Sequence, residues 1–191
     1  VYDRDTDTIE RVSVDDLGNE SDDASFSPSI SSDGRYVAFS SSATNLIAVD
    51  TNITEDIFVY DLQNNTIERV SVDDLGNEGN SGSASPSISS DGRYVAFSSY
   101  ATNLVAGDTN GEQDVFVYDR DLNTVKRISV SDLGAEGDFE SYGPSISSDG
   151  RYVAFISDAT NLIVGDINGA LDIFVYDRDT DTIERVSVDD L

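Results

Sequence analysis

The sequence predicts an all-β protein built of β-propeller blades, each a sheet of four antiparallel strands. A unit of 58 residues is written three times without insertion or deletion, as the spacing of Pro28, Pro86 and Pro144 shows. Each unit holds short runs of β-branched and aromatic residues bounded by turn residues. No segment repeats its apolar residues with a period of 3.6, so almost no helix is expected. A fixed period of this size is typical of stacked units that share a core.

The repeats also divide the chain. Val1 to Leu17 recurs letter for letter at Val175 to Leu191, so three full units are accompanied by a duplicated 17-residue end. We expect a partial blade at 1–17, made of the end of a third strand and a fourth strand. Blades one, two and three are expected at 18–75, 76–133 and 134–191. Because the chain starts within what would be a strand, we interpret it as a window on a longer array.

The second unit illustrates the four expected strands. The first covers 86–90 and the second 93–99, with Asp91-Gly92 between them. Asp-Gly between two apolar runs predicts a tight type I′ hairpin, in which both turn residues have positive φ. The third strand is expected at 115–118, and the fourth at about 124–130 after a polar turn.

The faces of these strands predict their depth in the blade. The second and third strands, 94–97 and 115–118, are apolar on both faces, which is typical of strands that are covered on both sides. In the fourth strand, charged residues such as Glu68 and Arg69 stand beside Ile67 and Val70, as in a partly solvated outer strand. Such units fit the blades of a propeller.

Two motifs resemble a known family. The stretch 86–97, Pro-Ser-Ile-Ser-Ser-Asp-Gly-Arg-Tyr-Val-Ala-Phe, resembles the hairpin of TolB-like propeller repeats, the WD-like repeats of bacterial envelope proteins. Asp-Val-Phe-Val-Tyr-Asp at 114–119 is similar to their third strand. The resemblance covers all three units and implies a TolB-like propeller. For function it implies a module that docks a protein partner on its loop face, although propellers host many unrelated tasks.

Composition narrows the function classes. The chain has 38 acidic and 11 basic residues, a formal net charge of −27, and neither His nor Cys. Such a charge is repelled by nucleic acid and by anionic membrane surfaces, and no run is suited to membrane insertion. Without His and Cys, Ser-His-Asp or Cys-His catalysis and the usual zinc sites are excluded. Almost every acidic position is copied between units, so we expect no enzyme.

The loop between the second and third strands carries the candidate site. In unit two it reads Gly-Asp-Thr-Asn-Gly-Glu-Gln-Asp at 107–114, with oxygen side chains at alternate positions. Alternating oxygens on a tight loop are how calcium is wrapped, and the pattern resembles the loops of dockerins and integrin-type propellers. The predicted calcium ligands are Asp50, Asn52, Asp56, Asp108, Asn110, Glu112, Asp114, Asp166, Asn168 and Asp172. The alternative is plain turn chemistry, because Asp and Asn also cap turns through their own backbone.

The linker between units is acidic as well, for example along 73–78. In a propeller this linker and the calcium-like loop emerge on one face, so a carboxylate of one blade is placed to help bind an ion held by its neighbour. The alternative is a solvated acidic rim.

We therefore expect a non-catalytic, extracellular, calcium-binding β-propeller repeat protein with a structural, adhesive or filament-forming role. The bacterial periplasm or cell surface is an equally acceptable location. Three blades leave open edges, so self-association through the repeat ends is expected. The alternative function is a partner-binding TolB-like module of the bacterial envelope. An accessory propeller of a hydrolase or glycan-processing enzyme would need a cluster of aromatics and carboxylates found in one unit only, and the sequence has none.

Overall fold

The computed structural model describes residues 1–188, which form strands and turns without any helix. The first sheet holds β3 (Ser25–Ile30), β4 (Tyr36–Ser41), β5 (Asp56–Asp61) and β6 (Thr66–Arg69). The second holds β7 (Ser83–Ile88), β8 (Tyr94–Ser99), β9 (Asp114–Asp119) and β10 (Thr124–Arg127). The third holds β11 (Ser141–Ile146), β12 (Tyr152–Ser157), β13 (Asp172–Asp177) and β14 (Thr182–Arg185). A small hairpin of β1 (Tyr2–Asp3) and β2 (Thr8–Ile9) precedes them.

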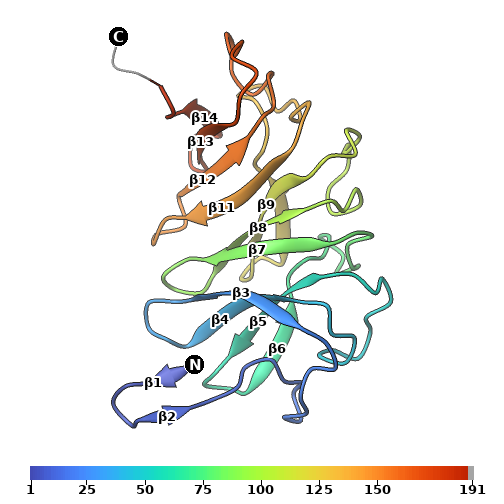
Figure 1. Cartoon of the computed structure of the whole chain (residues 1–191), viewed down its shortest axis with the longest axis vertical. Helices are drawn as coiled ribbons and strands as arrows, with labels where there is room; N and C mark the ends of the chain where they lie inside the picture. The colour runs from blue at the N-terminus through green and yellow to red at the C-terminus, as the bar shows by residue number, and fades with distance from the viewer. Residues whose placement is uncertain (189–191) are drawn as a thin grey trace.

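The prediction of an all-β chain with four-stranded antiparallel sheets is confirmed. Figure 1 shows the three sheets stacked in chain order along the long axis, with the hairpin β1–β2 beside the first. Within each sheet the strands follow chain order, and the first strand of the middle sheet, β7, contacts both β3 and β11. The strands of each sheet lie inside one predicted unit. Residues 189–191, at the end of the third predicted blade and of the duplicated end, lie outside the described residues.

The core lies between the sheets, as the apolar faces of the middle strands predict. Every residue of β9 is buried, and so is all of β8 except its first residue. Phe97 and Phe116 stack with ring centroids 5.8 Å apart, and Val59 of the first sheet packs into the same cluster. The fourth strand β10 has only Val125 buried, which confirms its outer position.

The predicted type I′ turn at the Asp-Gly pairs is wrong. Only the glycine has positive φ, +75° at Gly92, and Asp91 does not. The turn closes one residue earlier, with the Gly92 N–H donating to the Ser89 carbonyl at 3.0 Å. The Asp91 carboxylate accepts from the Ser89 hydroxyl at 2.6 Å and from the Arg93 N–H at 3.0 Å. These side-chain bonds explain why Ser-x-Asp-Gly-Arg is repeated in every unit.

The fourth strand is shorter than predicted. It was expected over 124–130, but β10 ends at Arg127. Beyond it the ladder is continued partly by a side chain, because the Val115 N–H donates to the Ser129 hydroxyl at 3.1 Å. Val130 then forms an isolated bridge with the linker that follows.

Neighbouring blades meet through a repeated contact between a tyrosine and a glycine. A Cβ atom built on Gly92 would lie 2.1 Å from the ring of Tyr36, and one on Gly150 would lie 2.2 Å from the ring of Tyr94. Glycine is therefore required at both turns by close approach as well as by its positive φ. Among the described residues, nothing lies within 4 Å of the equivalent atom on Gly34, which no preceding blade covers.

The same turns are joined by backbone hydrogen bonds between blades. The Ser32 N–H donates to the Ser90 carbonyl at 3.1 Å, and the Ser90 N–H donates to the Ser148 carbonyl at 2.9 Å. Successive serines in this series are 58 residues apart, so the same hydrogen bond is repeated at both junctions between sheets. No helix among residues 1–188 is long and apolar enough to cross a membrane.

Candidate functional site

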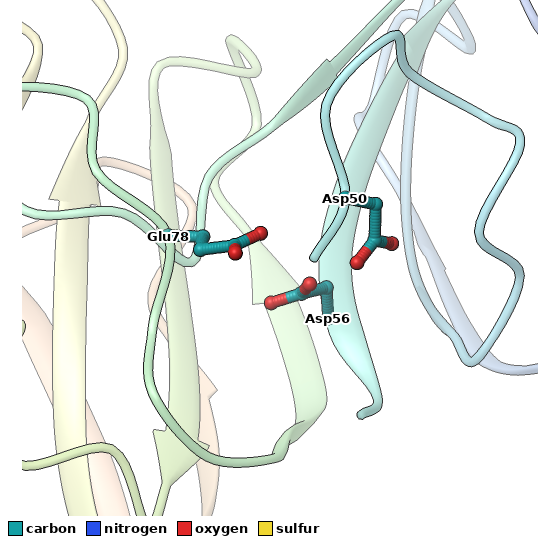
Figure 2. A group of neighbouring side chains, drawn as sticks. All are labelled: Asp50, Asp56 and Glu78. Carbon is teal, nitrogen blue, oxygen red and sulfur yellow. The ribbon is translucent and has the colours of Figure 1, made fainter. Parts of the chain in front are cut away.

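The loops between the second and third strands bring aspartates together at the junctions between blades. In unit one, Asp50 lies in the loop and Asp56 opens β5, where its side chain is fully buried. Glu78 reaches them from the linker that follows the blade. One carboxylate oxygen from each of the three lies within 4.8 Å of the others. Figure 2 shows the carboxylates facing a common space.

An arginine from the end of the fourth strand enters each of these clusters. The Arg69 guanidinium lies 3.8 Å from Asp50, 3.1 Å from Asp56 and 2.8 Å from Glu78. In unit two, Arg127 lies 3.5, 3.1 and 2.9 Å from its three carboxylate partners. We call each group of two aspartates, one glutamate and one arginine a junction cluster: Asp50, Asp56, Glu78 and Arg69 in the first, and Asp108, Asp114, Glu136 and Arg127 in the second.

The third unit has only part of this arrangement. Arg185 lies 2.8 Å from Asp166 and 3.1 Å from Asp172. Within residues 1–188 no glutamate joins this pair, because the glutamate of each junction cluster comes from the following repeat. Glu20, which holds the corresponding place at the start of the chain, pairs with Arg11 on the surface.

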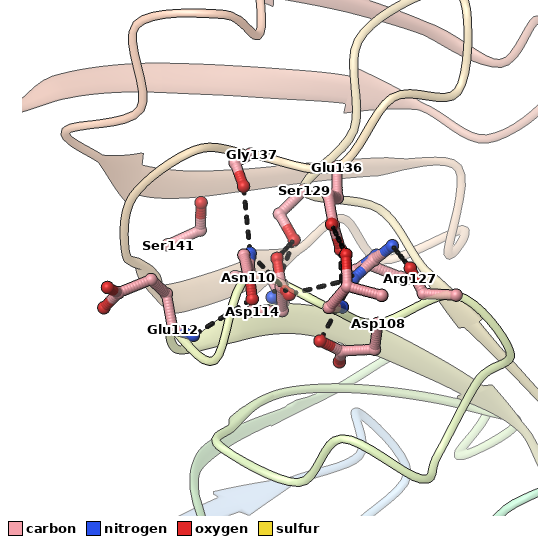
Figure 3. Close-up of polar contacts among 12 residues, drawn as sticks. Asp108, Asn110, Glu112, Asp114, Arg127, Ser129, Glu136, Gly137 and Ser141 are labelled. Carbon is pink, nitrogen blue, oxygen red and sulfur yellow. Dashed lines mark hydrogen bonds and ion pairs between the residues drawn. The ribbon is translucent and has the colours of Figure 1, made fainter.

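The predicted asparagine ligands have another role in the structure. Asn110 accepts the Glu112 N–H at 3.0 Å through its side-chain oxygen, and its amide nitrogen donates to the Gly137 carbonyl at 2.9 Å. That nitrogen also contacts Asp114 at 3.3 Å. Figure 3 shows the Glu112 carboxylate pointing away from Asp108. The structure thus brings together the aspartate pairs predicted from sequence. The asparagines lie beside them and stabilise the turn by accepting a backbone N–H two residues further on, as Asn52, Asn110 and Asn168 all do. Glu112 stands apart from the aspartates.

The glutamate of each junction cluster is held in place by the loop it meets. Glu136 accepts the Thr109 N–H at 3.0 Å and also the Thr109 hydroxyl. Thr51 holds Glu78 in the same way. Burial opposes ionisation of Glu136, but the bonds from Thr109 and the charge of Arg127 hold its pKa below the ordinary value. Glu136 is therefore a firmly placed carboxylate that spans two repeats.

The buried loop aspartates Asp50 and Asp108 have fewer hydrogen-bond donors than the glutamates. The Asp108 side chain is only 2% exposed, and its Oδ1 has no hydrogen-bond partner among the described residues. Burial, together with the nearby charge of Asp114, raises the pKa of Asp108 to about 6. Asp50 is likewise 2% exposed with an unpartnered Oδ1, and burial raises its pKa. One guanidinium therefore faces three carboxylates, and one buried oxygen, Oδ1 of the loop aspartate, lacks a donor.

The other linker acids have separate structural roles. Asp73 caps its own turn by accepting the N–H groups of Leu75 and Asn77 at 2.9 and 2.8 Å. Asp74 reaches the next blade and accepts the Val125 N–H of β10 at 2.8 Å. The linker acids Asp73, Asp74 and Glu78 thus make three distinct contacts and are not equivalent members of a solvated rim.

Sequence reasoning missed the arginines of the junction clusters. The Arg127 side chain turns into the calcium-like loop and contacts Asp108, Asp114 and Glu136. The available signal was the recurrence of an arginine at 58-residue intervals in a chain with only 11 basic residues. The cluster can hold a cation through carboxylate oxygens and tie two blades together, but it contains no nucleophile with an adjacent base.

No protein-family profile and no curated protein matches the chain. Solved structures do match. TolB from Acinetobacter baumannii is 22% identical over 87% of this chain, with a TM-score of 0.54. A putative TolB from Agrobacterium tumefaciens is 19% identical over 85% of the chain, with a TM-score of 0.54. The fold is that of a TolB-like β-propeller.

The propeller domain of a protease also matches the chain. The β-propeller domain of the trilobed protease from Pyrococcus furiosus is 16% identical over 88% of the chain, with a TM-score of 0.54. The chain covers 33%, 48% and 44% of these three structures, so it spans a third to a half of their length. At such identities the likeness establishes the fold alone.

Proposed function

We propose that this chain is a non-catalytic, structural propeller-repeat module on whose two end faces further copies of the same repeat dock head to tail. The observation that supports it is the exposure, at the two ends, of apolar positions that are buried or partly buried where two blades meet. Val70 and Ile128 are 0% exposed, but their counterpart Val186 in the third sheet is 47% exposed. At the other end Ile30 is 51% exposed, whereas its counterpart Ile88 is 7% exposed.

The two end faces complement each other because each is one half of a repeated junction. Tyr152 is 41% exposed at one end, and it is the counterpart of the tyrosines that press on Gly92 and Gly150. At the other end lies a cleft of ≈ 820 Å³ between the hairpin β1–β2 and the turn that contains Ile30 and Gly34. A docking copy would place Tyr152 against Gly34.

The duplicated end shapes how copies assemble. Residues 1–17 pack on the first sheet as a preceding outer strand would, with Asp16 accepting the Ile67 N–H at 2.9 Å. A docking copy brings its own version of this segment, so one version must leave. This displacement is needed at every junction, in a six-bladed ring of two chains as in an open array. We favour an open head-to-tail array, because a heterologous interface closes only when its rotation completes a ring.

The test is the mass of the chain in solution, measured by light scattering over a range of concentrations. We expect the mass to rise above that of the monomer. Gly34→Ala should prevent this, because its methyl group would clash with Tyr152 as it does with tyrosine at the internal junctions. Gly18→Ala is the matched control, since Gly18 also has positive φ and its counterparts Gly76 and Gly134 meet nothing within 4 Å even inside the array. A monomer at every concentration, or equal association of both variants, would refute the proposal.

Calcium binding at the acidic loops and an extracellular or periplasmic location belong to the same proposal. A divalent cation would offset part of the self-repulsion of a chain with net charge −27. At millimolar calcium and a dissociation constant of about 0.1 mM, one site adds about 1.4 kcal/mol to the free energy of unfolding. Thermal unfolding with calcium and with chelator measures this, and equal midpoints would contradict it.

A second candidate is a protein partner on the loop face. Leu17, Leu75 and Leu133 lie in the linkers, 58 residues apart, and are 87%, 87% and 97% exposed. An exposed leucine at the same position of each linker would offer an apolar partner one contact per repeat. This alternative is favoured if light scattering finds only monomers.

A further inference from the structure

We infer that each complete junction cluster binds one calcium ion through carboxylates that come from two successive repeats. This inference rests on the proposed calcium binding and changes its ligands: the glutamate of the following repeat replaces the asparagines and Glu112 of the loop. The assigned ligands are Asp50, Asp56 and Glu78 at the first junction, and Asp108, Asp114 and Glu136 at the second.

The first argument is convergence of hard oxygen donors. One oxygen each from Asp50, Asp56 and Glu78 lies within 4.8 Å of the others, and the three side chains face the same space in Figure 2. Calcium takes several carboxylate and carbonyl oxygens in a flexible geometry, so a modest closure of this group would suit it.

The second argument is the unpartnered oxygen in each cluster. The side chains of Asp50 and Asp108 are 98% buried, and in each the Oδ1 atom has no hydrogen-bond partner among the described residues. The nearest guanidinium nitrogens are 3.8 and 3.5 Å away. A buried carboxylate oxygen without a donor is costly, and a bound cation removes that cost.

The third argument is charge. Three carboxylates around one guanidinium leave two negative charges in excess, which one divalent ion balances. The ion and the arginine share the same carboxylates, so binding requires the guanidinium to shift off the carboxylate oxygens while its charge stays beside the cluster. Arg127 is suited to this because its Nε has no hydrogen-bond partner within residues 1–188 and its NH2 bond to the Gly107 carbonyl is long, at 3.2 Å.

The origin of the glutamate has a structural consequence. Because it comes from the following repeat, a bound ion ties two blades together. The pair Asp166 and Asp172 has no such glutamate in the described residues, so the monomer should bind two ions. A site made by each loop alone would instead give three.

The experiment is calorimetric titration of the chelator-treated full chain with calcium, at a concentration where light scattering finds monomer. We expect a stoichiometry of two. Glu136→Gln and Glu78→Gln should each reduce it to one. Glu20→Gln is the matched control, because Glu20 occupies the same repeat position without an aspartate pair beside it, and it should leave the stoichiometry at two. Glu112→Gln should also have no effect.

Arg127→Gln supplies a second readout that does not depend on losing a ligand. It should raise calcium affinity at its cluster at least tenfold, and calcium should restore the melting temperature that this variant loses. If Glu136→Gln does not fold, the calcium affinity of Arg127→Gln and the stoichiometry of the unmodified chain still test whether the junction clusters bind calcium.

Three ions per chain that are insensitive to Glu78→Gln and Glu136→Gln would overturn the inference and leave calcium binding by the loops intact. No binding to the unmodified chain would overturn both, and would mean that the arginine alone completes the cluster. Head-to-tail docking is tested separately, by the mass of the chain in solution, so its failure is distinguishable from either result.

Discussion

Replacing Gly92 by alanine isolates the contribution of one junction between blades to stability. Gly92 has a φ of +75° and its added Cβ would lie 2.1, 2.8 and 2.7 Å from three atoms of the Tyr36 ring. The chain contains its own control. Gly34 has the same φ of +75° in the same Ser-Ser-Asp-Gly-Arg-Tyr turn, and among the described residues nothing lies within 4 Å of its added Cβ.

The two variants share one cost and differ in another. At both positions an L-residue in the left-handed region costs about 1–2 kcal/mol, reduced by about 0.4–1 kcal/mol because alanine restricts the unfolded chain. Only Gly92→Ala adds overpacking, about 1–3 kcal/mol. The ring of Tyr36 cannot move freely, because the Arg120 guanidinium lies 4.4 Å from its centroid and donates to the Gly92 carbonyl at 2.5 Å. We therefore expect an excess of about 2 kcal/mol for Gly92→Ala.

The assay is urea and thermal unfolding of both variants at a concentration where the chain is monomeric. For a chain of this length 1 kcal/mol corresponds to about 2–4 °C in melting temperature, so the excess is about 4–8 °C. Gly150→Ala, which meets Tyr94 at 2.2 Å, should behave like Gly92→Ala. Equal destabilisation by Gly34→Ala and Gly92→Ala would refute the argument, because it would show that blade contact adds nothing to the backbone cost.

Two further predictions concern stability. Arg35 donates to Asp61 at 2.9 and 2.7 Å and lowers the pKa of that carboxyl to about 2. A lowered folded-state pKa stabilises the fold above about pH 4, and this contribution, about 2 kcal/mol, is lost as the pH falls towards 2. Asp61→Asn should therefore flatten the unfolding free energy across that window, and an unchanged slope would contradict the assignment. Ser85 has a φ of +56° immediately before a proline, where the third repeat has Gly143 at +63°. Ser85→Gly should raise stability by about 0.5–1 kcal/mol in denaturant titrations, and a loss of stability would show that the serine side chain contributes more than its strained backbone costs.

Much of the fold could be predicted because each unit repeats the same local signals. The number of sheets, their four strands and the outer place of the fourth strand follow from the 58-residue period and from which strands are apolar on both faces. The turn type at Asp91-Gly92 could not, because Ser89 and Asp91 close the turn with side-chain bonds that a two-residue motif does not reveal. The end of β10 was missed for a similar reason, since Ser129 substitutes a hydroxyl for a backbone group.

The candidate site was predictable only in part. The aspartate pairs were identified from their spacing within one loop, and the structure brings both members together. Glu78 and Glu136 lie 28 residues from Asp50 and Asp108 along the chain, in the linker of the next unit, so their approach depends on how blades stack. Sequence placed that linker on the same face, but which of its acids reaches the loop depends on the bonds from Thr51 and Thr109.

By itself the sequence determined the repeat, the strands and the acidic loops, because these depend on the identity of neighbouring residues. The tertiary structure decided what those loops face. It placed Arg69 and Arg127 among three carboxylates, pressed Tyr36 and Tyr94 onto glycines of the next blade, and left Tyr152 and Gly34 uncovered at the two ends. Identical residues have these different surroundings because burial depends on whether another blade lies beside them, and that depends on position in the stack.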